Sequence, residues 1–150
     1  MTSAVFHHEA ATLKALANPK RLEIVYLLGQ RQLTASEIEQ MTGFPQANLS
    51  QHLRELKEGR IIVAERSGKN IRYRLTHPNF RRLAKILAET TTPKPAQNRE
   101  TQPSEVQDPV CGMWVEPASA RWQNLYKGAT FFFCASGCYH RFRKSPTVYV

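Results

Sequence analysis

The sequence predicts a mainly helical chain with small β-sheets, organised as two folded parts of unequal size. Three observations lead to this prediction. Apolar residues recur at helical spacing through much of the first 90 residues. A proline-rich stretch then interrupts this pattern, and all three cysteines and both tryptophans follow the stretch. We therefore expect a larger helical domain and a smaller C-terminal module that carries the thiol chemistry.

Composition and charge limit the classes of partner. The 150 residues are 41% hydrophobic and 22% charged, which allows a packed core. Lys and Arg number 21 against 12 Asp and Glu, and the net charge of +9 favours nucleic acid or an acidic membrane surface as a partner. No apolar run approaches the roughly 18 residues of a membrane-spanning helix, and the N-terminus lacks the features of a signal peptide. Three cysteines, an odd number, argue against a disulfide framework, so we expect a cytoplasmic location.

The break between the two parts lies around residues 90–109. This stretch contains four prolines and, among large aliphatic side chains, only Val106. It cannot bury enough apolar surface to offset the entropy of ordering it. We therefore predict a first domain over residues 1–92, an extended linker over residues 93–107 and a second domain over residues 108–150.

The first three helices are marked by apolar spacing and by their end signals. The spacing predicts a helix over residues 5–17. Asn18-Pro19 provides an N-cap and a proline at the first helical position, and the helix that starts there ends at Gly29. Thr34 and Glu37 have the spacing of a capping box, which opens a short third helix.

A tight glycine turn and a basic hairpin complete the first part. After the turn at Gly43, a fourth helix begins near Pro45, with an inward stripe of leucines. Two alternating segments around Ser67-Gly68 predict a hairpin, and a last helix covers residues 79–89. Two short helices joined by a tight turn and followed by such a hairpin predict a winged helix-turn-helix.

The fourth helix and the hairpin form the predicted DNA-binding surface. The second helix of a helix-turn-helix fits the major groove, where amide and hydroxyl side chains read base edges. Arginines and lysines of the wing neutralise phosphates or enter the minor groove. The candidate contacts are Gln46, Asn48, Ser50, Gln51, His52, Arg54 and Lys57 on the helix and Arg66, Lys69 and Arg72 in the wing. For His52, a packed or capping side chain is as good an interpretation as a base contact.

Three segments carry a resemblance to a known family. Ala15–Leu22, Gln46–Leu56 and Arg72–Leu75 resemble the ArsR/SmtB family of bacterial repressors, and the similarity covers about residues 5–90. The resemblance implies a homodimer paired through its first and last helices, which binds a roughly two-fold symmetric operator in double-stranded DNA. It also implies an inducer that weakens DNA binding.

The usual inducer sites of that family are not matched in this sequence. Metal-sensing members place cysteines where Thr34, Ala35 and Ser36 stand here, and the basic last helix has no histidine. His7 and His8 could assist a metal site, although adjacent histidines near an N-terminus are more often exposed to solvent. We therefore expect the inducer site to lie outside the winged-helix part.

The C-terminal part offers three cysteines at suggestive spacing. Cys111 lies in a Pro/Gly turn, and a predicted hairpin around Lys127-Gly128 leads into Cys134. If a helix begins near Cys134, the side chains of Cys134 and Cys138 project from one face with their Cβ atoms about 6 Å apart. That separation is too wide for an unstrained disulfide and suits two thiolates that share a metal ion. Cys111 can then supply a third ligand.

The cysteine spacing also carries a second resemblance. Asp108–Met113 and Phe132–Cys138 resemble segments of the YHS/TRASH family of metal-binding domains, over about residues 108–148. The resemblance implies heavy-metal handling by a small, cysteine-rich, treble-clef-like module. Soft-metal sensing is the favoured role, while a structural Zn²⁺ and redox switching through the thiols stay open. A domain of about 40 residues needs such a clip to sustain its fold.

Ligand softness gives a preference among metals. Three thiolates favour Cu(I) or a related soft ion, whereas Zn²⁺, the alternative, requires a fourth ligand. His140 or Met113 could provide it, although His140 fits a surface position better and Met113 fits a packed one.

The combined prediction is a metal-responsive transcriptional repressor that binds operator DNA as a homodimer and is released by a soft metal ion on the C-terminal cysteines. The alternatives are a metal-trafficking or storage module and a thiol redox-responsive regulator with a structural zinc. An RNA-binding or membrane-surface protein would not explain the helix-turn-helix and wing. An enzyme is the least supported class, because the thiols lack a His/Asp partner set and no phosphate-binding glycine loop is present.

Overall fold

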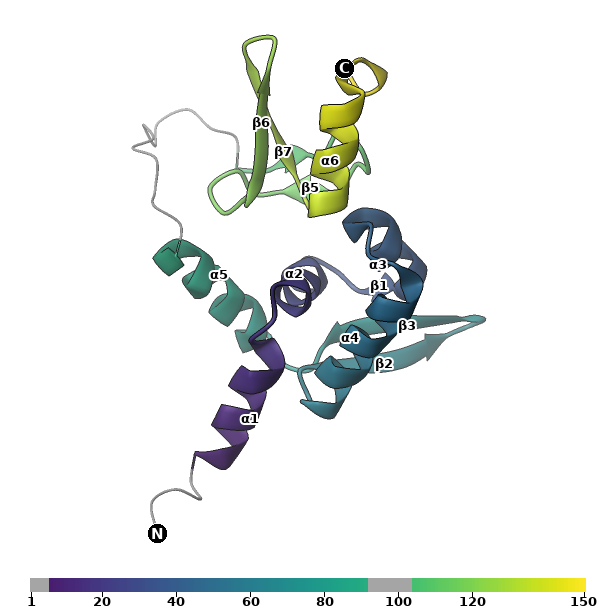
Figure 1. Ribbon diagram of the computed structural model, residues 1–150, viewed down its shortest axis with the longest axis vertical. Coiled ribbons are helices and arrows are strands. Elements are labelled where there is room, and N and C mark those ends of the chain that lie inside the picture. The colour runs from purple at the N-terminus through teal and green to yellow at the C-terminus, as the bar shows by residue number, and fades with distance from the viewer. Residues whose placement is uncertain (1–5, 92–103) are drawn as a thin grey trace. The chain divides into compact units, whose positions relative to one another are not determined.

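The computed structural model describes residues 6–91 and 104–150 (Figure 1). By its internal contacts the chain divides into two compact units, one of residues up to 39 with 44–84 and the other of residues 40–43 with those from 85 onward. Most of the predicted linker over residues 93–107 lies outside the described residues. Its last two residues, Val106 and Gln107, form a short strand. Within the described residues, no helix is both long enough and apolar enough to cross a membrane.

The part of the chain before residue 92 is a helical assembly with one small sheet (Figure 1). Its sheet has the order β1-β3-β2, with both pairings antiparallel. The hairpin β2–β3 confirms the predicted wing, whereas β1 was not predicted because two residues are too short to show alternation. The elements are α1 (His7–Leu16), α2 (Pro19–Leu28), β1 (Leu33–Thr34), α3 (Ala35–Thr42), α4 (Gln46–Glu58), β2 (Ile62–Ser67), β3 (Asn70–Leu75) and α5 (Asn79–Thr91).

The predicted helix starts are confirmed in atomic detail. The Asn18 side-chain oxygen accepts hydrogen bonds from the backbone N–H groups of Lys20 at 3.0 Å and Arg21 at 3.2 Å. At the start of α3, the Glu37 N–H donates to the Thr34 hydroxyl oxygen at 3.2 Å, and the Thr34 N–H donates to the Glu37 carboxylate at 2.7 Å. The turn between α3 and α4 contains Gly43 at a φ of +75°, a conformation that a side chain would strain.

The core of this part is aliphatic. Its most deeply buried side chains include Ile24, Leu27, Ile38, Leu49 and Leu56, so the inward leucine stripe of α4 packs as predicted. Helix α1 differs from this pattern, because Leu16 is its one buried residue among those the structure describes. The α1 stripe residues Phe6 and Leu13 are 65% and 57% exposed.

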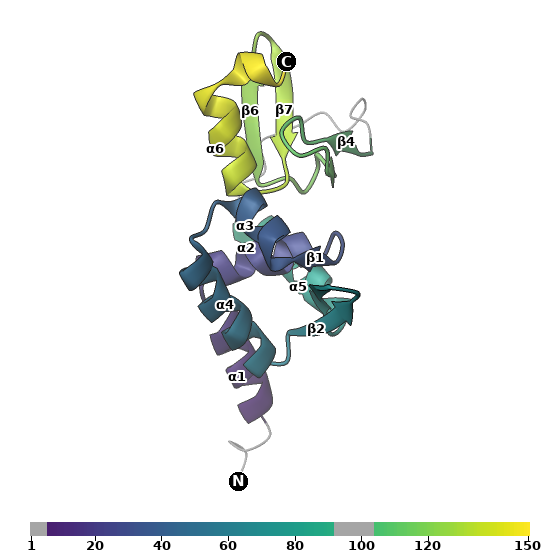
Figure 2. The ribbon, with the colours of Figure 1, turned by 90° about the vertical axis from the view of Figure 1, so that its right-hand side faces the viewer.

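The C-terminal unit is a small α/β module. Helix α6 lies along the hairpin β6–β7, as Figure 2 shows, and the hairpin confirms the predicted turn at Lys127-Gly128. A second two-stranded sheet pairs β4 with β5. The elements are β4 (Val106–Gln107), β5 (Trp114–Val115), β6 (Trp122–Tyr126), β7 (Ala129–Phe133), α6 (Ser136–Lys144) and a 3₁₀ turn η1 (Pro146–Val148).

The core of this module is aromatic. Phe133 and Phe142 are fully buried, with their ring centroids 5.0 Å apart. The Phe131 ring lies 5.1 Å from that of Phe142, and the Tyr126 ring meets the Phe142 ring edge-on at 5.9 Å. Such pairs contribute about 0.5–1.5 kcal/mol each beyond the burial of their area. Phe142 therefore ties α6 to both strands of the hairpin.

Candidate metal centre and DNA-binding surface

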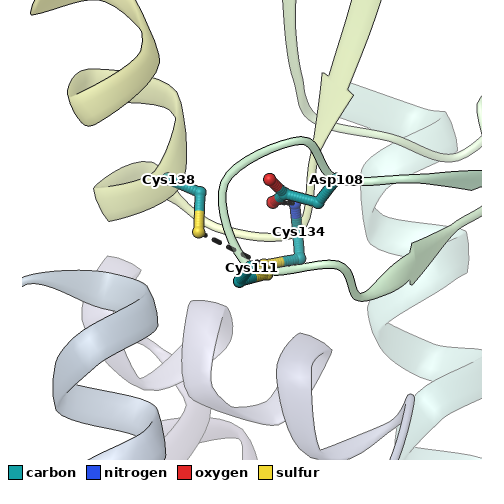
Figure 3. Close-up of side chains that lie close together, drawn as sticks. All are labelled: Asp108, Cys111, Cys134 and Cys138. Atoms are coloured by element: carbon teal, nitrogen blue, oxygen red, sulfur yellow. Dashed lines mark hydrogen bonds between the residues drawn. The ribbon is translucent and has the colours of Figure 1, made fainter. Parts of the chain in front are cut away.

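The three cysteines come from three different local structures that meet at one point (Figure 3). Cys111 lies in the turn between β4 and β5, where Gly112 takes a φ of +73°. Cys134 directly follows β7, and Cys138 lies in the first turn of α6. The helix begins at Ser136, two residues later than expected, so Cys134 precedes the helix rather than starting it.

The distances between the sulfur atoms suit a shared metal ion. The Cys111 and Cys134 Sγ atoms are 3.4 Å apart, and the Cys134 and Cys138 Sγ atoms are 3.7 Å apart. Metal–sulfur bonds of about 2.3 Å require sulfur–sulfur distances of about 3.8 Å in a tetrahedral site and about 4.0 Å in a trigonal one. A movement of a few tenths of an ångström would therefore admit an ion, and the residues fit a thiolate-bound metal.

A carboxylate that the sequence analysis missed completes the cluster. Asp108 is 1% exposed, and one of its oxygens lies with the three sulfurs in a group whose ligand atoms are all within 4.8 Å of one another. Its Oδ1 accepts the Val110 N–H and its Oδ2 accepts the Cys134 N–H, both at 2.8 Å. The available signal was its position three residues before Cys111 in the same tight turn.

Burial and hydrogen bonds between the sulfur atoms shift the pKa values of the cluster in opposite directions. Hydrogen bonds from Cys134 and then Cys138 lower the pKa of the Cys111 thiol to about 3. The hydrogen bond with Cys111 raises the pKa of Cys134, and burial raises it further. Burial also raises the pKa of the Asp108 carboxyl. Cys111 is thus held as a thiolate, the form that binds metals.

His140, one of the two expected fourth ligands, lies outside the group of side chains that could hold a metal ion with the cysteines. His140 is exposed, and its ring packs against the Tyr139 ring at 5.3 Å and lies 6.4 Å from the Trp122 ring. Met113 is buried, and its backbone oxygen accepts the Asp108 N–H at 2.8 Å. These positions agree with the surface and packed interpretations of the two side chains.

The candidate DNA contacts on α4 other than His52 are exposed, whereas its leucines Leu49, Leu53 and Leu56 are buried. The Gln51 amide has a local partner, since it donates to Glu55 at 3.4 Å, and His52 is half-buried. A helix with this division can present its polar face to the major groove without disturbing the core. The exposed candidates are Gln46, Asn48, Ser50, Gln51, Arg54 and Lys57.

The three wing candidates differ in their surroundings. Arg66 and Lys69 are exposed near the hairpin turn, and the Arg66 Nε donates weakly to the Gly68 oxygen at 3.4 Å. Arg72 is half-buried, and its guanidinium lies 3.8 Å from the Glu37 carboxylate of the α3 capping box. Arg66 and Lys69 are therefore exposed wing cations, whereas Arg72 also stabilises the start of α3.

His52 is the exception on α4. Its Nδ1 atom is buried and has no hydrogen-bond partner among the described residues. Burial lowers the pKa of His52, and the nearby cations Arg21 and Lys20 lower it further. A neutral, half-buried imidazole supports the packed interpretation of this residue more than that of a base contact.

An ion pair that the sequence did not reveal braces α4 from behind. Arg21 of α2 pairs with Glu55 of α4, and its Nε donates to the carbonyl oxygen of Ala15 at the end of α1. This arginine thus connects three helices, which fixes the angle at which α4 is presented. Sequence spacing gave no signal of it, because the partners are 34 positions apart.

Two family models match separate parts of the chain. Residues 18–63 match the model described as "Bacterial regulatory protein, arsR family", and residues 106–150 match the YHS domain. Together the two models cover the helix-turn-helix and the cysteine module, in the order that the sequence analysis expected.

Individual proteins similar to this chain agree with the family-model matches. The chain is 38% identical over 78 residues to the biofilm growth-associated repressor of Xylella fastidiosa, a match covering 52% of this chain and 68% of that protein. It is 31% identical over 70 residues, or 47% of this chain, to the HTH-type transcriptional regulator KmtR of Mycobacterium tuberculosis, and spans about half, 54%, of that relative's length. The homodimeric winged helix-turn-helix domain of Mb0332 from Mycobacterium bovis has 32% identity and a TM-score of 0.55, over 59% of this chain and 82% of that one.

Proposed function

The chain belongs to the ArsR family of bacterial regulatory proteins and carries a C-terminal YHS domain, and from this we propose that it is a metal-responsive transcriptional repressor. The family is one of repressors rather than enzymes, which agrees with the absence of enzyme motifs in the sequence. In the proposed arrangement the two domains span residues 1–92 and 108–150, and the protein acts in the cytoplasm.

Operator binding rests on the exposed face of α4 and on the wing. Asn48, Gln51 and Ser50 are assigned to base edges, because amide and hydroxyl groups can both donate to and accept from bases. Arg54, Lys57, Arg66 and Lys69 are assigned to phosphates, and Arg72 to the same role while it retains its contact with Glu37.

A homodimer would cover the apolar residues that α1 and α5 expose. Phe6 at the N-cap of α1 and Leu13 within it are 65% and 57% exposed, and Ile86 and Leu87 of α5 are 48% and 36% exposed. Exposed apolar side chains of this size favour burial against a protein partner. Two copies paired through these helices would present two α4 helices to successive major grooves of one operator.

The sulfur cluster is the observation that carries the metal response. Among the described residues, Cys111, Cys134, Cys138 and Asp108 form the one group of three or more His, Cys, Asp and Glu side chains able to hold a metal ion. Three soft thiolates favour Cu(I) or a related soft ion, with Zn²⁺ as the alternative. The inducer site is thereby assigned to the appended YHS domain and not to the winged-helix part.

Release from DNA requires a difference in affinity. A ligand shifts an equilibrium only by binding one conformation more tightly than the other. The DNA-free conformation must therefore bind the metal ion more tightly than the operator-bound one. A coupling of about 1.4 kcal/mol would weaken operator binding tenfold.

The test is an anaerobic titration of Cu(I) into full-length protein bound to a labelled DNA fragment from upstream of its own gene, followed by fluorescence anisotropy. We expect operator affinity to fall more than about tenfold. Cys111→Ser should remove the response and leave metal-free DNA binding intact. His140→Ala is the matched control and should respond like the unaltered chain.

Each alternative gives a different outcome. A structural zinc or a trafficking role leaves DNA affinity unchanged when the metal ion is bound. A thiol redox switch, favoured by the 3.4 Å separation of the Cys111 and Cys134 sulfurs, would release DNA on treatment with peroxide without added metal. A Cys111→Ser variant that still responds to Cu(I) would refute the assigned site.

A further inference from the structure

Asp108 is the member of the cluster whose role the proposed function leaves open. It is a buried acidic side chain, three residues before Cys111, and carboxylates in such positions are stable only with strong partners. As an oxygen donor it would be a fourth metal ligand. As a hydrogen-bond acceptor it would instead organise the ligands around it. The contacts of its two oxygens favour the second role.

Both oxygens are already engaged by backbone groups. Oδ1 accepts the Val110 N–H at 2.8 Å, inside the turn that carries Cys111. Oδ2 accepts the N–H of Cys134 itself at 2.8 Å, as Figure 3 shows from the position of the Cys134 nitrogen beside the carboxylate. Bonds to a charged acceptor at this distance are about twice as strong as neutral ones.

The backbone of Asp108 is anchored as firmly as its side chain. Its N–H donates to the Met113 oxygen and its carbonyl accepts the Gly112 N–H, both at 2.8 Å. Asp108 therefore closes the turn around Cys111 from within. The hydrogen bond that its Oδ2 accepts from the Cys134 N–H joins this turn to a different segment, the junction of β7 and α6. The residue is a strut between the two parts of the chain that supply the sulfurs.

We propose that Asp108 is the positioning residue of the thiolate site: it holds the Cys111 turn against the Cys134 amide, so that three sulfurs, and no carboxylate oxygen, face the metal ion. This inference rests on the metal site of the proposed function, and it adds a reason for that site to prefer a soft ion over Zn²⁺. A site of three thiolates suits a soft ion in trigonal coordination, whereas Zn²⁺ in a closed protein site takes four ligands. Partners of this kind orient ligands, and their loss typically weakens metal binding 10–100-fold.

The experiment compares full-length Asp108→Asn and Asp108→Ala with the unaltered chain, with Glu105→Gln as the matched control. Glu105 is exposed at the start of the same module, so its change removes one negative charge without touching the cluster. Cu(I) affinity is measured anaerobically by competition with a chromophoric chelator, and the ligand set at saturation by X-ray absorption.

We expect about 10–100-fold weaker Cu(I) binding for Asp108→Ala, a smaller loss for Asp108→Asn, which retains one acceptor oxygen, and none for Glu105→Gln. The unaltered chain should show three sulfur neighbours and no oxygen at Cu(I). In Asp108→Ala the freed Cys111 turn should lower this to two sulfurs, a stable arrangement for Cu(I). Circular dichroism of the same variant excludes general unfolding of the module, because unfolded cysteines can also bind Cu(I) through two sulfurs.

Two results would overturn the inference. An oxygen neighbour in the unaltered chain that disappears in Asp108→Asn would make Asp108 a ligand. Equal Cu(I) affinity in all four proteins would leave it without a role at the site. If Asp108→Asn loses the circular dichroism of the module, Asp108→Glu takes its place, because it keeps the charge and displaces the oxygens by one methylene.

The failures of the two proposals differ. If the unaltered chain binds no Cu(I) in a Cys111-dependent way, both are wrong. If it binds Cu(I) and releases DNA while the Asp108 variants match it, the positioning role alone is wrong.

Discussion

The DNA-binding surface and the thiol cluster differ in how their functional side chains relate to the core. On α4, Asn48 and Ser50 are exposed while Leu49 between them is buried. In the module, Cys134 and Cys138 are as deeply buried as Phe133 and Phe142. The DNA surface can therefore change without loss of fold, whereas the thiol site shares its segments with the core. Mutations at the DNA-binding surface should weaken function without lowering stability, whereas mutations at the thiol site should lower both.

The two cores also differ in size and chemistry. The first unit packs aliphatic side chains from several helices and the sheet, whereas the module relies on a few aromatic rings in about 45 residues. A core this small leaves little reserve of stability. The largest effects are therefore expected in the module.

Phe142→Ala gives the strongest test of this contrast. Phe142 is fully buried and contacts the rings of Phe131, Phe133 and Tyr126. Its loss should cost about 3–5 kcal/mol, which is enough to unfold a small module. Calorimetry of the full-length variant should show the module transition lost or strongly lowered, with the winged-helix transition and DNA binding retained.

Val148→Ala is the matched control, because Val148 is in the same module and is 72% exposed. It should change the module transition by less than about 0.5 kcal/mol. If Phe142→Ala lowers both transitions together, the two units unfold cooperatively and the contrast between them is wrong.

Asn48→Ala tests the converse in the winged-helix part. The side chain is exposed, so the free energy of unfolding should change by less than about 0.5 kcal/mol. Operator affinity should fall by about 1–3 kcal/mol, and discrimination at one base position should relax. Gln123→Ala, an exposed amide on β6 of the module, is the control in the same binding assay and should bind like the unaltered chain.

The sequence predicted the first unit well, because its signals are local. Asn18, Thr34 and Glu37 form the predicted caps, and the leucine stripe of α4 is buried as its spacing indicated. Leu13 was correctly predicted to be helical, whereas Phe6 lies just before the helix. Both are exposed, since periodicity finds an apolar face without saying what covers it.

Sequence signals were absent where a contact joins residues far apart in the chain or where a strand is very short. β1, β4 and β5 have two residues each and depend on their partner strands. Asp108 was missed because its role depends on the Cys134 N–H, 26 positions away, which no local pattern reveals. The three cysteines were found together because their residue type alone points to metal chemistry.

Lys69→Ala separates phosphate contacts from base contacts within the DNA-binding surface. Lys69 is exposed near the tip of the wing, so its loss should weaken binding to operator and to unrelated DNA by a similar factor. The slope of log affinity against log salt concentration should fall by about one. Anisotropy titrations at several salt concentrations measure both effects. A change in base preference without a change in salt slope would assign Lys69 to base contact instead.

His52→Gln should produce the smallest effect. It tests whether His52 belongs with the exposed DNA-binding side chains of α4 or with its buried core. Burial lowers its pKa in the folded protein, as do Arg21 and Lys20, while Glu55 opposes them. The unfolded chain keeps an ordinary imidazole, with a pKa of about 6.5. As the pH falls through that value, the unfolded state takes up the proton first, so the folded state loses stability until its own lower pKa is reached. Urea unfolding between about pH 7.5 and 5.5 should therefore show a smaller loss of stability in His52→Gln than in the unaltered chain.

His7→Gln, at an exposed position of α1, should keep the full loss. Equal pH dependence in His52→Gln and the unaltered chain would return His52 to the exposed set, and a specific loss of operator affinity in the same variant would make it a base contact after all.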